Sequence, residues 1–322
     1  TLYAAGIRPH LCAVTERTPQ DELLNSLPED FLRDITLIAA EVVHPRTRRA
    51  FGEAVLFVKP DEVFLNFAPL LGSKGGAGSE LCPIDVMNPL VGNLGLSAAI
   101  GLGFKNIYLL GLDCGRSARF AEAHPASGRF YAGSPDTRRE SGTTRELAAR
   151  GVPGNFGGTC LTNALLDTGR RGLEIVLGHA QGRVCCYNCS DGCLIEGAPA
   201  LSLKELSELS SPPFKRAALF AQLNSLTTVL PGPDTPHLHE LLAPGVFQAH
   251  CEELLSMLKA PAPGRLQLMQ MLSSVHEKSL TLLIAPETRF MPALLNGTLQ
   301  SIFILTVCAI YHTPSEEACL RR

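Results

Sequence analysis

The feature that most constrains the fold is an alternation of strand-like and helix-like segments along the first two-thirds of the chain. Short apolar runs rich in Val and Ile, closed by polar residues or by proline, occur at 10–16, 35–43 and 54–59. A small-residue-rich segment with apolar positions at helical spacing, 88–104, is followed at once by the apolar run "NIYLLGLD" (106–113). Strand, helix and strand in this rhythm predict an α/β fold with a doubly wound parallel sheet.

The alternation resumes after a long interruption. The polar stretch 114–158 contains no convincing strand, and a loop of this length within a compact domain is typically a functional or mobile segment. Segment 162–180 then has a helical pattern, 183–189 has a strand pattern, and 190–199 has the composition of a loop.

The last third of the chain has a different character, which sets the predicted domain division. Beyond Ser202 the sequence shows helices separated by prolines and no strand signal. We predict a Rossmann-type α/β domain over residues 1–205 and an all-helical domain over 206–322. Because the chain opens at Thr1 without Met, in what reads as the middle of a domain, we expect the first domain to be truncated at its amino end.

Composition argues against several classes of protein. A net charge of −3 over 322 residues gives no general attraction to nucleic acid. The most apolar segment, 299–312, is shorter than the ~20 residues that span a bilayer, so we expect a buried core helix and no membrane span. The eleven cysteines are scattered and no export signal is visible, so we expect free thiols in a reducing cytoplasm.

The segment "CCYNCSDGC" (185–193) concentrates four of these cysteines. Zinc sites are typically built from two CxxC or Cys/His pairs, whereas this chain has one CxxC, at Cys186 and Cys189. In a strand, Cys185 and Cys186 point to opposite faces. We therefore predict that these cysteines fill a strand and hold no metal.

The polar residues of the same segment follow a predicted strand, at the edge where open α/β sheets bind ligands. Asn188, Ser190 and Asp191 offer donors and acceptors for a base or a ribose, and Gly192 allows close approach of the backbone. An Asx or Ser/Thr turn explains the same residues equally well. Both interpretations stay open at the level of the sequence.

A second candidate site lies around the helix predicted within 88–104. Gly92 and Asn93 lie near its start, where free N–H groups and the helix dipole favour a phosphate. Asp113 ends the following predicted strand, again on the ligand side. The segment has no GxGxxG sequence, so a nicotinamide cofactor is not favoured.

Two further segments carry candidate chemistry. The loop "AEAHPASGRFYAGSPD" contains His124 and Tyr131, and such a pair beside a nucleotide suits glycosyl transfer, with one group accepting the acceptor's proton and the other binding the leaving phosphate. His124 is equally explained as a surface residue or as a residue that positions the substrate. "GVPGNFGGT" (151–159) is either a phosphate cradle or a flexible lead-in to a helix.

Five segments in order, "GIRPHLCAVTE", "GLGFKNIYLLGLDCG", "HPASGRFYAG", "VPGNFGGT" and "YNCSDGCLIEGAPAL", resemble the motility-associated factor (Maf) proteins, the bacterial flagellin glycosyltransferases. The resemblance covers roughly residues 1 to 205. It implies a Rossmann-like catalytic domain similar to that of bacterial sialyltransferases. The implied reaction moves a nonulosonic acid of pseudaminic or legionaminic type from its CMP-activated form to a Ser or Thr hydroxyl of flagellin.

On this interpretation His124 and Tyr131 are catalytic, and the donor contacts seven residues: Gly92, Asn93, Asp113, Asn188, Ser190, Asp191 and Gly192. CMP is a good leaving group and no metal-ligand spacing is visible, so we expect no obligatory cofactor or metal.

The chain departs from the family's pattern at two places. The Gly-rich nucleotide-binding turn expected before "AAGIRPH" is absent, and "DVMNPLVGN" stands where the family has a Thr-rich run, which leaves open whether Asn88 or Asn93 takes its role. One alternative is a 6-hydroxymethylpterin pyrophosphokinase-like enzyme, which shares this core but needs ATP and carboxylate-held Mg²⁺. The other is a non-catalytic protein that binds flagellin.

Overall fold

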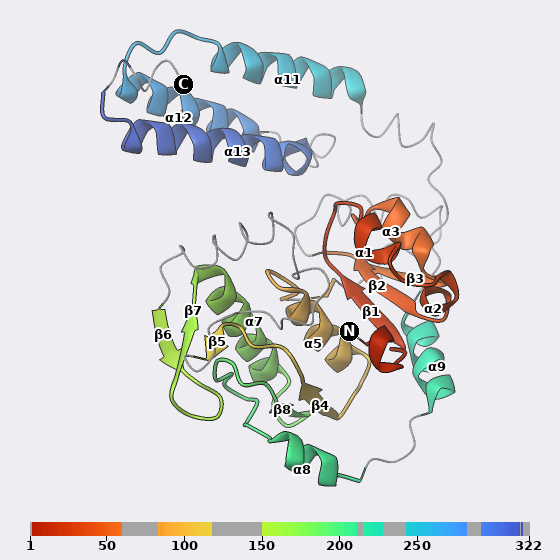
Figure 1. Ribbon diagram of the computed structural model, residues 1–322. Helices are drawn as coiled ribbons and strands as arrows, with labels where there is room; N and C mark the ends of the chain where they lie inside the picture. The colour runs from red at the N-terminus through yellow and green to blue at the C-terminus, as the bar shows by residue number, and fades with distance from the viewer. Residues whose placement is uncertain are drawn as a thin grey trace. The chain divides into compact units, whose positions relative to one another are not determined.

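The computed structural model describes residues 2–59, 83–84, 86–117, 150–210, 215–227, 243–281, 291–315 and 317 (Figure 1). Contacts divide the chain into an α/β unit, Thr1–Pro60 with Cys82–Thr228, and a helical unit, Asp61–Leu81 with Val229–Arg322. Helices α8 (Leu203–Glu208) and α9 (Arg216–Leu226) belong to the α/β unit. The domain boundary near residue 205 stays a prediction.

The first sheet is parallel, as the alternation predicts, and has the order β1–β2–β3. Its central strand is buried at every position, which is typical of a parallel sheet covered on both faces. Leu37 packs with residues of the short helices that connect the strands, whereas Ile38 packs with Leu94 of helix α5 (Val91–Gly101). The elements are β1 (Leu11–Val14), α1 (Asp21–Leu24), α2 (Glu29–Arg33), β2 (Thr36–Ala40), α3 (Pro45–Ala50) and β3 (Glu53–Phe57), after the 3-10 turn η1 (Tyr3–Ala5).

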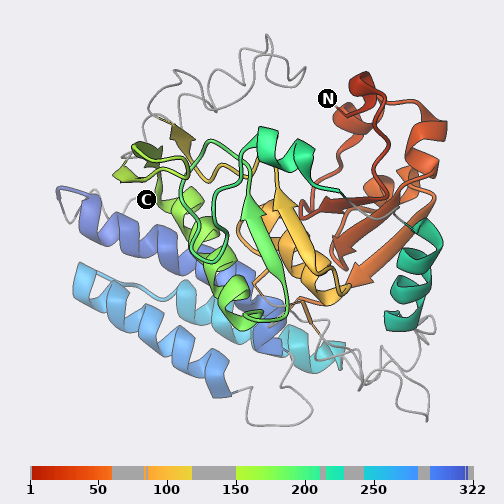
Figure 2. The same ribbon diagram turned by 90° about the horizontal axis from the view of Figure 1, so that it is seen from below.

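The second sheet is the parallel pair β4 (Asn106–Leu109) and β8 (Cys185–Asn188), seen side by side in Figure 2. Helices α5 (Val91–Gly101) and α7 (Ala164–His179) pack on one face of this pair through Leu96 and Leu173. Because α5 also contributes to the core of the β1–β3 sheet, it joins the two sheets. These elements confirm the predicted α/β class with parallel strands.

A third, antiparallel sheet corrects the expectation that 114–158 contains no strand. Its order is β5–β7–β6, with β5 at Arg116–Ser117, β6 at Arg150–Pro153 and β7 at Thr159–Thr162. These strands carry no sequence signal, because β5 has two residues and β6 contains Gly and Pro, so neither shows an alternating apolar pattern.

The helical unit contains α11 (Pro244–Leu258), α12 (Arg265–Thr281) and α13 (Met291–His312), which pack through Leu254, Val275 and Leu299. Segment 299–312 was expected to be buried, but Ile304 and Leu305 are 62% and 71% exposed, so only one side of α13 packs in this core. Within the described ranges, no helix is both long and apolar enough to cross a membrane.

Candidate functional site

The segments that follow β4 and β8 lie against each other, because the two strands are parallel and end at the same edge. The backbone N–H of Leu112 donates to the Ser190 hydroxyl at 3.1 Å, and that of Cys193 donates to the Asp113 carbonyl at 2.8 Å. The structure thus brings Asp113 together with the predicted residues 188–192. Strand β4 ends at Leu109, so Asp113 lies in the loop after the strand and not at its end.

Asn188 organises the loop after β8, which we call the donor loop (residues 188–193) because the family resemblance predicts that it contacts the sugar donor. Its side chain is fully buried, accepts the Ser190 N–H at 3.0 Å and donates to the Cys193 carbonyl at 3.3 Å. Ser190 is also buried, and its hydroxyl accepts from Leu112. The Asx-turn interpretation is therefore confirmed, and both side chains help to build the loop.

Gly192 packs directly against the loop after β4. A Cβ added at this position would lie 2.3 Å from the Asp113 carbonyl oxygen and 2.4 Å from its Cα. Backbone atoms cannot move aside as a flexible side chain can, so the close approach requires glycine.

Asn155, within "GVPGNFGGT", is a residue that the sequence reasoning missed. Its buried side-chain amide donates to the carbonyls of Asn188 and Ser190, both at 2.9 Å, while its backbone N–H donates to Gly192 at 2.9 Å. The Gly-rich segment is therefore a clamp on the donor loop. The presence of a polar residue among glycines was the one sequence feature that could have pointed to Asn155. The sequence could not identify the partners of Asn155, because they lie more than thirty residues away.

Asp191 differs from its neighbours in the donor loop. Its side chain is half-buried, and among the described residues no hydrogen bond to its carboxylate is found. Asn155, Asn188, Ser190 and Gly192 are all engaged in holding the loop. Asp191 is therefore the member of the predicted set whose polar atoms are most available to a ligand.

Asn93 and Gly92, the residues predicted near the start of α5, are both packed against neighbouring elements. Asn93 is fully buried, accepts the Leu90 N–H at 3.2 Å and donates to the Gly169 carbonyl at 2.8 Å, which ties α5 to α7. Gly92 lies in the first turn of α5, where a Cβ would lie 2.1 Å from the Leu112 side chain. Ligand roles for these two residues stay predictions.

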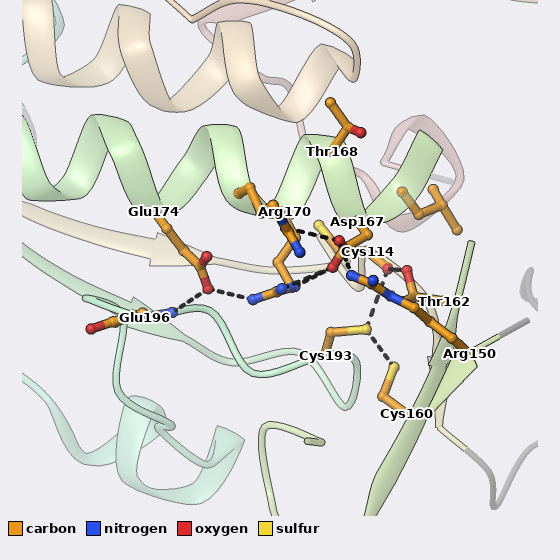
Figure 3. A network of polar contacts seen from close by, with 12 residues as sticks. Cys114, Arg150, Cys160, Thr162, Asp167, Thr168, Arg170, Glu174, Cys193 and Glu196 are labelled. Atoms are coloured by element: carbon orange, nitrogen blue, oxygen red, sulfur yellow. Dashed lines mark hydrogen bonds and ion pairs between the residues drawn. The ribbon is translucent and has the colours of Figure 1, made fainter. Parts of the chain in front are cut away.

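A charged network connects helix α7 to the chain after the donor loop (Figure 3). The buried carboxylate of Asp167 pairs with Arg150, with Arg170 at 2.8 Å and with Arg171 at 3.0 Å. Arg170 also pairs with Glu174, whose carboxylate accepts the Glu196 N–H at 3.0 Å. Burial raises the pKa of Asp167, but the hydrogen bond from Arg170 and the surrounding arginine charges outweigh burial and hold that pKa below its usual value.

The four cysteines of "CCYNCSDGC" occupy different environments. Cys185 is exposed and Cys186 is buried, which confirms that they point to opposite faces of β8. Cys193 lies in the α/β core with Cys160 and Cys114. Across the described part of the chain, no group of three or more His, Cys, Asp and Glu residues is arranged to hold a metal ion.

The two predicted catalytic residues, His124 and Tyr131, lie outside the described residues. Their roles stay predictions.

Comparison with known proteins gives one structural relationship. No family model matches the sequence, and no curated protein matches it. The solved structure of MAf glycosyltransferase from Magnetospirillum magneticum AMB-1 matches 99% of this chain with a TM-score of 0.57 and 19% sequence identity. This chain covers 52% of that chain, about half its length. At this identity the likeness establishes the fold, and the resemblance to Maf proteins is confirmed at that level.

Proposed function

We propose that this chain carries the catalytic domain of a glycosyltransferase that moves a CMP-activated nonulosonic acid to Ser or Thr hydroxyls of flagellin. The observation that carries the proposal is the Maf-like fold over 99% of the chain. The structured loop at the shared carboxyl edge of β4 and β8 adds support, because ligands of open α/β sheets bind at that edge.

In the proposed complex the donor loop receives the CMP part of the sugar donor. The Asn155 clamp and the Asn188 turn hold the loop in one conformation before the ligand arrives, which lowers the entropy lost on binding. Asp191 accepts a hydrogen bond from a ribose hydroxyl or from the cytosine amino group.

In the proposed reaction, catalysis depends on stabilising the charge of the departing phosphate more strongly in the transition state than in the bound substrate. The acceptor hydroxyl attacks the anomeric carbon as the bond to CMP breaks, and negative charge grows on the departing phosphate. We assign the removal of the hydroxyl proton to His124 and a hydrogen bond to the phosphate to Tyr131, following the family resemblance. Donors positioned before the reaction stabilise that growing charge more than they stabilise the bound substrate.

Binding of CMP by the purified protein tests the proposal. We expect CMP to raise the melting temperature and ATP with Mg²⁺ to leave it unchanged. Asp191→Ala should raise the CMP dissociation constant roughly ten- to a hundred-fold in calorimetric titration, since a hydrogen bond to a charged group contributes ~1.5–3 kcal/mol.

Glu196→Ala is the matched control, because Glu196 is an exposed acidic residue just beyond the donor loop. It removes a charge of the same sign and should leave CMP affinity unchanged. Stabilisation by ATP with Mg²⁺ and not by CMP would replace the proposal with the pyrophosphokinase alternative. Equal CMP affinity of Asp191→Ala and the parent would remove the donor loop from the binding site.

A further inference from the structure

Two thiols 33 positions apart in the sequence meet inside the α/β unit. The Sγ atoms of Cys160, on β7, and Cys193, at the end of the donor loop, are 2.7 Å apart, and both residues are 0% exposed (Figure 3). A disulfide has its sulfur atoms at ~2.05 Å, so bond formation here needs a movement of less than ~1 Å.

We propose that Cys160 and Cys193 are a site of oxidative modification, at which hydrogen peroxide or a small alkyl hydroperoxide converts the two thiols into an intramolecular disulfide. The sulfur of Cys193 attacks the O–O bond, giving a sulfenic acid and one molecule of water or alcohol. The sulfur of Cys160 then displaces the hydroxyl group from the Cys193 sulfur, and this hydroxyl leaves as water with the Cys160 thiol proton. Each sulfur loses one electron to the peroxide, and both thiol protons leave in the products.

The surroundings of the pair assign the order of these steps. The hydrogen bond with Cys160 lowers the pKa of the Cys193 thiol, aided by the charge of Arg170 and a hydrogen bond with Thr162, against the opposing effect of burial. The hydrogen bond with Cys193 and burial raise the pKa of Cys160. The thiolate is the nucleophile in such reactions, so the positive charge of Arg170 favours the Cys193 sulfur as the first to attack, while the Cys193 thiol also donates to the Cys114 carbonyl at 3.3 Å.

The pair differs from the cysteine motif that the sequence displays. Cys186 and Cys189 form the CxxC, but burial raises the pKa of both thiols, that of Cys186 to about 11. Burial also raises the pKa of the neighbouring Cys114, to about 12. The structure therefore favours the pair that crosses from β7 to the donor loop over the local motif.

Complete burial also determines which oxidants can react. A peroxide is about the size of a water molecule or slightly larger, whereas glutathione disulfide must bring its own sulfur into line with the attacking thiolate. The pair is thus expected to respond to small peroxides and to be shielded from exchange with bulky disulfides.

Peptide mapping tests the proposal without reference to sugar transfer. The protein is treated with hydrogen peroxide, its remaining thiols are alkylated, and it is digested without reduction. Mass spectrometry should find the peptides containing Cys160 and Cys193 joined, and dithiothreitol should separate them. Glutathione disulfide should produce the same link at least about tenfold more slowly, because access to the sulfurs limits the exchange.

Variants distinguish this pair from its neighbours. Cys160→Ala should abolish the link, whereas Cys186→Ala and Cys114→Ala should retain it, with circular dichroism confirming that each variant is folded. A Cys186–Cys189 link in the parent protein, or sulfinic acid at Cys193 without any link, would overturn the proposal. Linking by glutathione disulfide at the peroxide rate would overturn the assignment to small oxidants.

Discussion

Asn155 places two donors of one amide group against two backbone carbonyls of the donor loop. Asn155→Ala should lower the free energy of unfolding by ~1–3 kcal/mol, because the buried Ser190 carbonyl loses its donor. Asn224→Ala, on an exposed position of α9, should stay within ~0.5 kcal/mol of the parent. Urea denaturation followed by circular dichroism measures both. Equal values for the two variants would mean that the clamp contributes nothing to stability.

The residues of the donor loop differ in how far the sequence predicts them. Asn188 is the last residue of a recognisable strand, and Asp191 and Gly192 follow shortly after it. The local sequence pattern and the geometry of α/β sheets are therefore sufficient to locate these three residues. Asn155 is separated from its partners by β7, α7 and β8. The role of Asn155 depends on the tertiary contact between its segment and the donor loop, and residue types and spacing in the sequence do not specify that contact.

Helix α7 contains one glycine that is tightly packed and one that faces open space. Replacing each with alanine should therefore change the stability of the α/β unit in opposite directions. A Cβ at Gly172 would lie 2.7 Å from the Asn93 side-chain nitrogen, whereas a Cβ at Gly178 would meet nothing within 4 Å. Gly172→Ala should therefore destabilise the α/β unit by ~1–3 kcal/mol through overpacking against α5. Gly178→Ala should stabilise it by ~0.5–1 kcal/mol, as glycine costs conformational entropy in a helix.

Thermal denaturation of the two variants beside the parent measures the difference. The close α5–α7 contact would be ruled out as a constraint on packing if Gly172→Ala melted at or above the temperature of Gly178→Ala.

At the scale of elements, predictability follows from hydrophobic burial. Strand β2 is buried at all five positions, and α7 shows apolar residues at helical spacing. Both elements can therefore be predicted from the pattern of apolar residues in the sequence. Strands β5 and β6 have few buried side chains and exist because they pair with β7. The β5–β7 pairing joins residues more than forty positions apart, whereas β6 and β7 form a local hairpin whose first strand contains Gly and Pro. Neither β5 nor β6 therefore shows a periodic apolar signal.

The two units of the molecule should lose stability at different pH values, because each contains a different kind of titrating group. In the helical unit, burial lowers the pKa of His250, and the charge of Lys278 adds to this effect while Glu253 opposes it. The His250 Nε2 atom is buried with no hydrogen-bond partner among the described residues. The positively charged form of the imidazole would therefore be poorly stabilised at this position. In the α/β unit, the arginines around Asp167 hold its pKa below the usual value.

The signs of these shifts set the order of acid unfolding. With a folded pKa below that of the unfolded state, His250 contributes stability above ~pH 6.5 that is lost as the pH falls, because the unfolded state then takes up the proton. The contribution of Asp167 is retained until the pH falls below about 4. Between about pH 7 and about pH 5, the helical unit should therefore weaken while the part of the α/β unit around Asp167 keeps its stability.

Hydrogen exchange read by mass spectrometry resolves the units, after correction for the intrinsic pH dependence of exchange. Protection of α11 and α12 should fall over this pH range, and protection of β4, α7 and β8 should not. His250→Phe should remove the pH response of the helical unit. His276→Phe is the matched control, because His276 is exposed on α12 and its ring already lies beside that of Phe303, 5.9 Å between centroids. A pH response that survives in His250→Phe, or disappears in His276→Phe, would show that a group other than the buried histidine governs the acid sensitivity of this unit.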